Sequence, residues 1–257
     1  MEIVVCVKQV PDVDDIKWTK ENNLDREQML SKINPQDEWA IDNAVNIKQK
    51  IRGTSITAIS MGPDKAKEVL EYALAKGADR AILLSDKRFS GSDTLITAKI
   101  IARAIKKYIP DFDLIITGQA AVDGDTEQTP IGIATELGIP DVTNVVAINN
   151  ADNKMVIAKQ KLGEDGAVTE VKTPCLVAVK EECELKITPR IDNYIKAQII
   201  KTETYNADDL GFSKEETGIL GSPTMVYKAF RPQNARNAQE ILDNTAHAIV
   251  DIILKAK

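Results

Sequence analysis

The sequence predicts an α/β fold with a mostly parallel sheet, a β-rich edge and an extended C-terminal arm that ends in a helix. Up to Leu137, short apolar runs alternate with amphipathic helical segments, and this order predicts βαβ units with right-handed crossovers. After Pro140, four strand-like runs follow one another with only turns between them. From Glu181 onward, charged stretches and scattered glycines replace the regular pattern until a last helical segment.

The first strand and the first helix carry the clearest signals. Ile3–Val7 is an uncharged β-branched run, typical of a strand buried in a parallel sheet. Asn34 and Pro35 then begin a helix, because asparagine is favoured at the N-cap and proline at the first helical position. Apolar residues at helical spacing follow, and Gly53 ends the helix.

Three further units repeat this order, with turn or capping residues before each helix. Asp125 is expected to cap the last of these helices, with Gln128 as its capping-box partner. The predicted strands are Ser55–Ser60, Arg80–Leu84 and Asp113–Thr117, and the predicted helices run from about Asp64 to Gly77, from Ser92 or Asp93 to Tyr108 and from about Thr126 to Leu137.

The β-rich edge and the arm complete the chain. An arm that cannot form its own core usually lies on another surface. Its last helix, from about Asn234, has an apolar stripe that needs such a surface, either its own domain or another subunit. We therefore divide the chain into an α/β domain, residues 1–185, and an arm, residues 186–257. The strands predicted for the edge are Val142–Asn149, Met155–Lys161, Val168–Val171 and Cys175–Val179.

Composition argues against several function classes. A net charge of -6 and an aromatic content of 4% do not suit a protein that binds nucleic acid through phosphates or stacked bases. No run approaches the roughly 18 apolar residues of a membrane span, and the N-terminus lacks the pattern of a secretory signal peptide. The three cysteines show no C-x-x-C spacing and no neighbouring histidine, so we expect a cytoplasmic protein without a metal site.

The candidate site lies where predicted strands end. Gly118–Pro130, GQAAVDGDTEQTP, leads from a strand into a helix, and ligands of open α/β sheets bind at that edge. Helix N-termini attract anions, and Gly124 permits a close backbone approach. The same segment is equally consistent with a capped helix that binds nothing. Asp123 and Asp125 would repel a phosphate, so we expect them to cap N–H groups or to accept from ribose hydroxyls.

Other strand-to-helix junctions would meet at the same edge. They are Cys6–Lys8, Ser60–Pro63 and Gly91–Thr94, and the start of the first helix at Asn34–Asp37 is expected to join them. The hydroxyls of Ser92, Thr94 and Thr97 can donate to phosphate oxygens, although helix capping explains these residues as well. Lys8 can likewise be a solvated surface lysine.

Catalytic fingerprints are absent from the sequence. No G-x-G-x-x-G follows a strand, and neither a P-loop nor a G-x-S-x-G elbow occurs. His247, the only histidine, lies among apolar residues and suits packing better than catalysis. A free-standing enzyme is therefore not expected, and the pattern favours a protein whose cofactor carries the chemistry.

Six segments form a series along the chain: VVCVKQVPD (Val4–Asp12), INPQDEWAID (Ile33–Asp42), ISMGP (Ile59–Pro63), ALAKGADRAILLSD (Ala73–Asp86), GQAAVDGDTEQTPIGIATELGIP (Gly118–Pro140) and EVKTPCLVAV (Glu170–Val179). Each is weak alone. Together, in this order and over essentially the full length, they resemble the beta (small) subunit of electron transfer flavoproteins.

The resemblance implies a doubly wound α/β domain whose C-terminal arm embraces an alpha subunit in a heterodimer. It implies a nucleotide site that holds AMP in conventional members, where the alpha subunit carries the only FAD, and a second FAD in the electron-bifurcating branch of anaerobic bacteria. The residues expected to bind the cofactor, from the junctions and the resemblance together, are Cys6, Lys8, Asn34, Pro35, Gln36, Asp37, Met61, Gly62, Asp93, Thr94, Thr97, Gly118, Gln119, Ala120, Ala121, Val122, Asp123, Gly124, Asp125, Thr126, Glu127, Gln128 and Thr129.

Three segments are similar to the bifurcating branch: DGDT (Asp123–Thr126), GSDTLIT (Gly91–Thr97) and LGSPTMVYKAF (Leu220–Phe230). The hydroxyls of Thr94 and Thr97 would suit the longer pyrophosphate–ribityl chain of FAD better than AMP. This branch implies that NADH gives a hydride to the FAD of this subunit. One electron then goes uphill to ferredoxin, and the other goes through the alpha-subunit FAD to a partner dehydrogenase.

Two departures from the family pattern bear on these expectations. The loop that docks partner dehydrogenases reads TPRIDNYIKAQIIK (Thr188–Lys201) and lacks the usual small-residue hinge and basic run. An acyl-CoA dehydrogenase is therefore not assumed as the partner, and another flavoprotein dehydrogenase, such as one acting on lactate, fits as well. Thr129–Ile131 replaces a more usual glycine-containing stretch, which changes the expected backbone path near the phosphates.

Two other function classes remain as alternatives. One is an adenine-nucleotide-binding module without flavin, resembling universal-stress or ATP-pyrophosphatase-type proteins, and the apolar helix of the arm counts against it. The other is a free-standing enzyme, against which the missing catalytic residues count.

Overall fold

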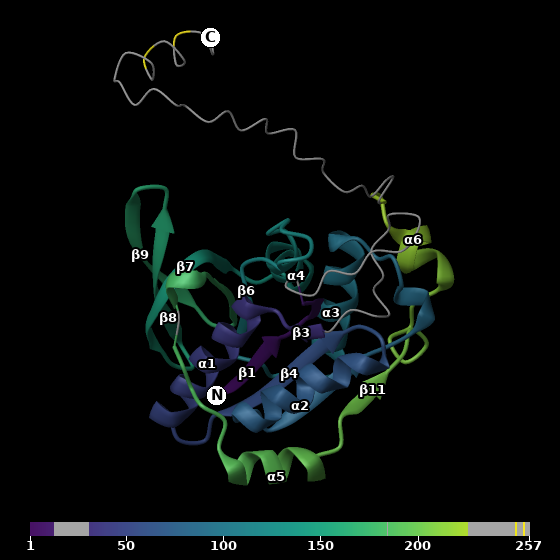
Figure 1. Ribbon diagram of the computed structural model, residues 1–257, viewed down its shortest axis with the longest axis horizontal. Helices are drawn as coiled ribbons and strands as arrows, with labels where there is room; N and C mark the ends of the chain where they lie inside the picture. Colours follow the sequence, from purple (N-terminus) through teal and green to yellow (C-terminus); the bar gives the residue numbers. More distant parts are fainter. Residues whose placement is uncertain (13–30, 184, 226–249, 251–253, 255–257) are drawn as a thin grey trace.

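The computed structural model describes residues 1–12, 31–183, 185–225, 250 and 254 of the 257-residue chain. The helix expected from about Asn234, with His247, lies outside these residues. The described residues form a nine-stranded sheet in the order β11-β5-β4-β1-β6-β10-β7-β8-β9 and a small two-stranded ribbon, β2-β3 (Figure 1). None of the helices in the described ranges is long and apolar enough to cross a membrane.

The strands and helices have the following bounds. The strands are β1 (Glu2–Cys6), β2 (Gln9–Pro11), β3 (Ser31–Ile33), β4 (Ser55–Met61), β5 (Arg80–Leu84), β6 (Leu114–Gly118), β7 (Asp141–Ala151), β8 (Met155–Leu162), β9 (Asp165–Lys172), β10 (Cys175–Val179) and β11 (Glu203–Tyr205). The α-helices are α1 (Pro35–Lys50), α2 (Lys67–Lys76), α3 (Thr94–Tyr108), α4 (Thr129–Leu137), α5 (Ile191–Ile199) and α6 (Gly218–Gly221), and short 3-10 helices occur at Asp64–Ala66, Lys87–Phe89, Glu181–Cys183 and Lys214–Glu216.

The sheet is mostly parallel, as the sequence predicts. Neighbouring strands from β11 to β7 run parallel, while β7, β8 and β9 form an antiparallel meander at one edge. One expectation for this edge is wrong: Cys175–Val179 is not an edge strand. It is β10, which lies between β6 and β7 with all five residues buried, because an uninterrupted apolar run can be buried on both faces.

Helices cover both faces of the sheet, so the domain is doubly wound. On β1, Ile3 and Val5 belong to the apolar cluster formed with α1 and α2, whereas the intervening Val4 belongs to the cluster formed with α3 and α4. This alternation follows from the two-residue period of a strand. Figure 1 shows α1, α2 and α5 together on one side of the sheet, with α3 and α4 on the other.

The strand order reverses beside β1. From β1 the chain continues to β4 and then β5 on one side, whereas β6 lies on the other side of β1. The connections that leave β1 and β6 therefore diverge and open a crevice at the carboxyl ends of these strands, which is where ligands of open α/β sheets bind.

The expected start of α4 is wrong by three residues. The helix begins at Thr129 rather than Thr126, and the residue at its N-cap is Gln128, whose side chain forms no capping hydrogen bond. Asp125 does not cap the helix. It has φ +46° and Glu127 has φ +56°, and residues in this left-handed region cannot belong to a right-handed helix.

Two elements in the expected arm were not anticipated from the sequence. Within residues 186–225, the nine-residue helix α5 packs on α2, and β11 pairs in parallel with β5 as an additional edge strand. The start of this region therefore lies on its own domain. Strand β11 has only three residues, Glu203–Tyr205, and no apolar run, so it cannot be recognised without its neighbour β5.

Candidate functional site

A cavity of about 710 Å³ opens at the carboxyl ends of β1, β4 and β6, and we call it the switch-point cavity. This volume lies in the range of small-molecule sites. Its walls come from segments far apart in the sequence: residues 6–11 after β1, 61–63 after β4, 91–97 at the start of α3 and 117–130 after β6.

Asp37, in the first turn of α1, joins the two strand ends beneath the cavity. Its Oδ2 accepts a hydrogen bond from the backbone N–H of Lys8 (2.8 Å), and its Oδ1 accepts one from Gly118 (3.1 Å). Burial raises the pKa of Asp37 to about 7, although these donors act in the opposite direction. A Cβ on Gly118 would lie 2.5 Å from Asp37 Oδ1, so only glycine fits where strand and helix meet.

Two amide side chains hold the loop that follows β6. Asn34 donates to the carbonyl of Ala120 (2.9 Å) and accepts from the N–H of Val122 (3.2 Å). Gln36 accepts from the N–H of Ala120 (2.8 Å). Asn34 stands at the N-cap of α1, as predicted, but its side chain forms no capping bond. These bonds fix the loop backbone, which leaves fewer side-chain groups of Asn34 and Gln36 for a ligand.

Lys8 and Asp123 form an ion pair at the cavity. The ammonium group contacts both carboxylate oxygens, at 2.7 and 2.8 Å, which joins the segment after β1 to the loop after β6. From the sequence, Asp123 is expected to cap N–H groups or to accept from ribose hydroxyls, whereas in the structure its carboxylate is bound by Lys8. The pair leaves less negative charge to repel a phosphate than the free carboxylate would.

Opposite walls of the cavity are also joined. Thr94, at the start of α3, donates its hydroxyl to Gln128 Oε1 (3.0 Å) just before α4. Gln119 is buried, accepts from the N–H of Asn144 (2.8 Å) and donates to Glu127 (3.3 Å). The loop therefore has a defined shape, with side-chain contacts to α1, α3 and β7.

The floor of the cavity contains groups that a ligand can use. The hydroxyl of Thr117, in β6, is buried and has no hydrogen-bond partner among the described residues. Cys6 also lines the cavity, and burial together with the neighbouring Asp37 raises the pKa of its thiol, so the thiol stays protonated at neutral pH. A buried polar group without a partner is unusual, and a ligand group can supply the missing partner of Thr117.

The structure brings most of the predicted site residues together. Every residue expected to bind the cofactor lines the switch-point cavity except Pro35, Gln36 and Val122. For Ser92 the sequence is consistent with a phosphate donor or with a capping residue, and in the structure its hydroxyl is bonded within the protein. That hydroxyl donates to the carbonyl of Phe89 (2.8 Å) and accepts from the N–H of Gly218 (3.2 Å).

Several cavity residues were missed from the sequence. Val10 and Ser31 come from the β2-β3 ribbon, whose strands are three residues each and have no periodic pattern to reveal them. The sequence indicates only that Phe89 and Ile133 are buried apolar residues, not that they line a cavity. Thr224 lies 131 residues after Asp93, to which it is hydrogen bonded, and no local pattern indicates such a contact.

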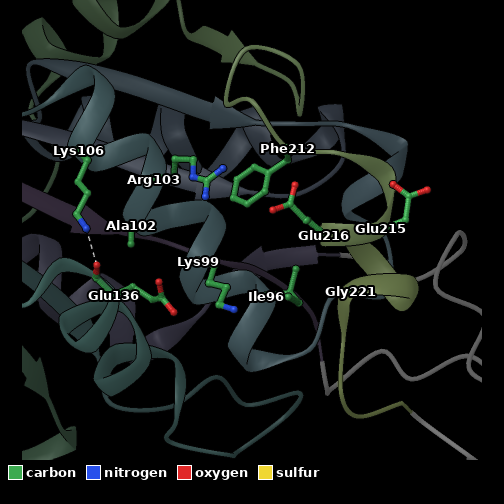
Figure 2. A pocket seen from close by; sticks show the side chains of 10 residues that line it. All are labelled: Ile96, Lys99, Ala102, Arg103, Lys106, Glu136, Phe212, Glu215, Glu216 and Gly221. Carbon is green, nitrogen blue, oxygen red and sulfur yellow. Dashed lines mark hydrogen bonds between the residues drawn. The ribbon is translucent and has the colours of Figure 1, made fainter.

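A second cavity, of about 450 Å³, lies between α3, the end of α4 and residues 212–221 (Figure 2). Its polar groups are largely paired within the protein. The Arg103 guanidinium lies 4.0 Å from the centre of the Phe212 ring and donates to the carbonyl of Gly211, while Lys106 donates to the carbonyl of Glu136. The Arg103 contacts hold residues 211 and 212 on α3 and the Lys106 contact joins α3 to α4, so we assign this cavity a structural role.

No group of three histidine, cysteine, aspartate or glutamate side chains within the described part of the chain is placed to hold a metal ion. Among the acidic residues of the site, Asp123 pairs with Lys8, Asp37 accepts backbone N–H groups and Glu127 accepts from the Gln119 side chain. The arrangement suits a bound organic cofactor held by loop backbone, hydroxyls and apolar side chains.

Comparison with known proteins gives a consistent result. Residues 23–203 match the family described as the electron transfer flavoprotein domain. The electron transfer flavoprotein subunit beta of Thermoanaerobacterium thermosaccharolyticum is 38% identical, covering 98% of this chain and 96% of that protein. That of Megasphaera elsdenii is also 38% identical, covering 99% and 97%. The caffeyl-CoA reductase-Etf complex subunit CarD of Acetobacterium woodii is 37% identical, covering 97% and 95%.

Proposed function

The chain belongs to the electron transfer flavoprotein family as a beta subunit, and on this premise we propose that its switch-point cavity holds FAD, with AMP as the alternative occupant. The observation that carries the proposal is the convergence of the predicted cofactor residues on one cavity where the strand order reverses. Electron transfer flavoprotein beta subunits pair with an alpha subunit, so the working unit is a heterodimer.

The residues present fit such a cofactor. The unpartnered hydroxyl of Thr117 and the hydroxyls of Thr94 and Thr97 offer polar contacts, while Met61, Phe89 and other apolar residues supply a surface for a ring system. FAD contains AMP and adds a second phosphate, a ribityl chain and the flavin ring, so the hydroxyls at the start of α3 have more ligand to contact with FAD than with AMP. Bound FAD supplies one- and two-electron redox chemistry.

The protein's own contribution is to bind and orient. Asp37 fixes the ends of β1 and β6 relative to α1, and Asn34 and Gln36 fix the loop after β6. The pair of Lys8 and Asp123 joins the segment after β1 to that loop. A cofactor between these segments is held in a preformed site, which keeps its distance to a second flavin constant.

We further propose a bifurcating role, in which NADH is the electron donor and ferredoxin and a partner dehydrogenase are the acceptors. Support comes from the segments similar to that branch and from a relative named as a subunit of a caffeyl-CoA reductase-Etf complex. The chain would then be the NADH-oxidising subunit of a cytoplasmic complex.

Helix α5 is the proposed docking surface for the partner dehydrogenase. Its outward side presents Ile191, Tyr194, Ile195 and Ile199, which are 81%, 49%, 59% and 78% exposed. Large apolar side chains gathered on one exposed helix indicate a contact surface. Its opposite side packs on α2, so the surface is held in place by the domain.

Cofactor release from the purified two-subunit complex tests this proposal. FAD and AMP are separated by chromatography and counted per heterodimer. Two FAD and no AMP are expected. One FAD with one AMP would make the nucleotide of this subunit structural rather than redox-active, and a complex without either in this subunit would contradict the proposed site.

A further inference from the structure

Thr224 forms part of the switch-point cavity although it comes from the far end of the described chain. It lies just before residues 226–257, and none of the other elements of the cavity is near it in sequence. Its place depends on a set of hydrogen bonds between two segments, Gly91–Asp93 before α3 and Gly218–Thr224, which we call the clasp.

Asp93 is the centre of the clasp. Its Oδ1 caps α3 by accepting from the N–H of Ile96 (3.1 Å), and its Oδ2 accepts from both the N–H (3.1 Å) and the hydroxyl (2.8 Å) of Thr224. Burial acts to raise the pKa of Asp93, but these donors outweigh it and hold that pKa below its usual range. The carboxylate is therefore charged at neutral pH, and its hydrogen bonds are of the stronger, charge-assisted kind.

Two serines, one from each segment, complete the clasp. The N–H of Asp93 donates to Ser222 Oγ (2.9 Å), whose hydroxyl donates to the carbonyl of Gly218 (2.7 Å). The N–H of Gly218 donates to Ser92 Oγ (3.2 Å). Each segment thus supplies donors and acceptors to the other, and three backbone N–H groups depend on side chains across the contact.

Glycines allow this close contact. A Cβ on Gly218 would overlap the backbone carbonyl of Arg88, and a Cβ on Gly91 would overlap the side chain of Ile219. Both glycines have positive φ, +57° and +75°. The two segments therefore fit in one arrangement, which other residues at these positions would prevent.

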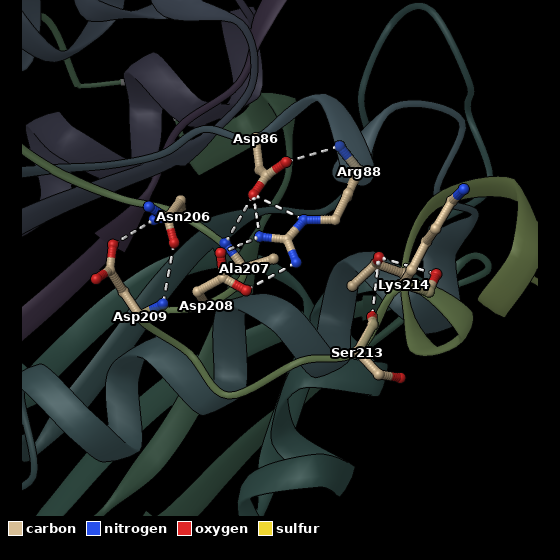
Figure 3. Close-up of polar contacts among 9 residues, drawn as sticks. Asp86, Arg88, Asn206, Ala207, Asp208, Asp209, Ser213 and Lys214 are labelled. Carbon is tan, nitrogen blue, oxygen red and sulfur yellow. Dashed lines mark hydrogen bonds and ion pairs between the residues drawn. The ribbon is translucent and has the colours of Figure 1, made fainter.

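Several earlier anchors attach the chain to the domain before it reaches the clasp, beginning with the ion pair of Arg80 and Glu203. After β11, the Arg88 guanidinium joins Asp86 and Asp208, both at 2.8 Å, and Asp86 also accepts from the N–H of Ala207 (Figure 3). The contact of Arg103 with Phe212 follows (Figure 2). Residues 203–224 are therefore attached to the domain at successive points, and the clasp, which lines the switch-point cavity, is the last of these points.

We propose that the clasp couples the switch-point cavity to the segment Gly218–Thr224, so that ligand binding and docking of this segment stabilise each other, and that Thr224 is a further residue of the ligand site. Thr94 and Thr97 line the cavity one and four residues after Asp93, so a ligand on the first turn of α3 holds the clasp in place. By linkage, the docked segment favours the ligand to the same extent. The coupling rests on the proposed function, because it needs a ligand in the cavity.

Hydrogen exchange on the purified two-subunit complex, with cofactor removed and then with added FAD or AMP, tests the coupling. The reporters are the backbone amides of Asp93, Gly218 and Thr224, whose acceptors lie across the clasp. Added ligand is expected to slow their exchange about tenfold, together with that of amides in the loop after β6. Slowing in that loop alone would overturn the coupling and leave the proposed function intact. No slowing with either ligand would overturn both.

Matched variants test the reverse direction. Thr224→Val and Ser222→Ala remove hydroxyls from the clasp while Asp93 keeps its cap on α3. The FAD dissociation constant of the complex is expected to rise about fivefold in each variant. The control is Thr135→Val, which removes an exposed hydroxyl bonded to the carbonyl of Ile131 on α4. This control is expected to leave the dissociation constant unchanged. An unchanged constant in the clasp variants, or an equal rise in the control, would overturn the proposal.

Discussion

At the scale of single residues, Asp37 determines how the site is assembled. It accepts N–H groups from the ends of two strands and has a pKa raised by burial to about 7. A carboxyl group with such a pKa is protonated in the folded protein at pH values where it is ionised in the unfolded chain. The geometry of the cavity and the stability of the domain are therefore both linked to pH through one side chain.

The free energy of unfolding is expected to fall as pH rises from about 4 to about 7. In this window the folded state retains a proton on Asp37 that the unfolded state, with an ordinary pKa of 3.8, has released. The stabilisation that protonated Asp37 gives the folded state, up to roughly 4 kcal/mol, is present at low pH. It is lost as pH rises through the pKa of the folded state. Urea unfolding of the ligand-free protein at pH 4 to 8 measures it.

Asp37→Asn is the variant that isolates this effect. Its amide cannot ionise, so the part of the pH dependence due to Asp37 disappears. Its nitrogen also cannot accept the second N–H group, so the variant is less stable than the wild type at pH 5. An unchanged pH profile in Asp37→Asn would contradict the assignment of the titration to this residue.

Thr117 and Ser60 make a second comparison between single residues. Both have buried hydroxyls without a partner among the described residues, but only Thr117 lines the cavity. Thr117→Val is expected to raise the ligand-free stability by about 1 kcal/mol, because it removes an unsatisfied buried group, and to weaken FAD binding by up to about tenfold.

Ser60→Ala is the matched control for this change. It is expected to gain similar stability without a change in FAD affinity. Thermal unfolding and flavin titration measure the two quantities separately. If both variants left FAD affinity unchanged, the hydroxyl of Thr117 would not be a cofactor contact.

At the scale of elements, the sequence predicts the units that have strong local signals. The run Ile3–Val7 and the junction Asn34–Pro35 correspond to β1 and α1, because burial in a parallel strand and a proline at the first helical turn are local requirements. The sequence correctly predicts that the loop from Gly118 to Gln128 lies at the end of β6. It does not predict the conformation of that loop. Asp125 and Glu127 are left-handed, and the loop around them is held by Asn34, Gln36 and Thr94 from other elements, which no local pattern contains.

The remaining misses have the same cause. Strand β11 exists because β5 offers it an edge, and Thr224 reaches the cavity because Asp93 binds it. Cys175–Val179 has the apolar pattern of an interior strand, yet its position between β6 and β7 depends on the order of the whole sheet. Sequence patterns indicate which elements form; long-range pairing decides where they lie.

Helix α5 gives a prediction at this scale. Replacing Ile191 and Ile199 by serine is expected to slow electron transfer to the partner dehydrogenase by about tenfold or more, because exposed apolar anchors dominate contact surfaces. Cofactor content and association with the alpha subunit stay unchanged. Val168→Ser, at a 67% exposed position on β9, is the control and is expected to have no effect on this rate. Equal rates in all variants would contradict a docking role for α5.

At the scale of the whole molecule, the sheet explains why one cavity gathers segments from so much of the chain. The connections after β1 and β6 diverge, the first turns of α1 and α3 approach the gap, and the clasp brings in Thr224. Each segment is fixed by contacts to another, so the switch-point cavity and the attachment of residues 203–224 form one connected structure. A subunit that passes electrons benefits from this rigidity, since transfer depends on constant distances between cofactors.

Flavin content in the wild-type complex, compared with that in a complex whose switch-point cavity is filled by Thr97→Trp, shows whether this cavity holds the flavin. Thr97 lines the cavity, and a tryptophan there takes the space of the ligand. Released FAD is counted per heterodimer, and association of the two subunits is checked alongside. We expect two FAD in the wild type and one in the variant, with the heterodimer intact. Equal FAD content in both complexes would contradict the claim that this cavity holds the flavin.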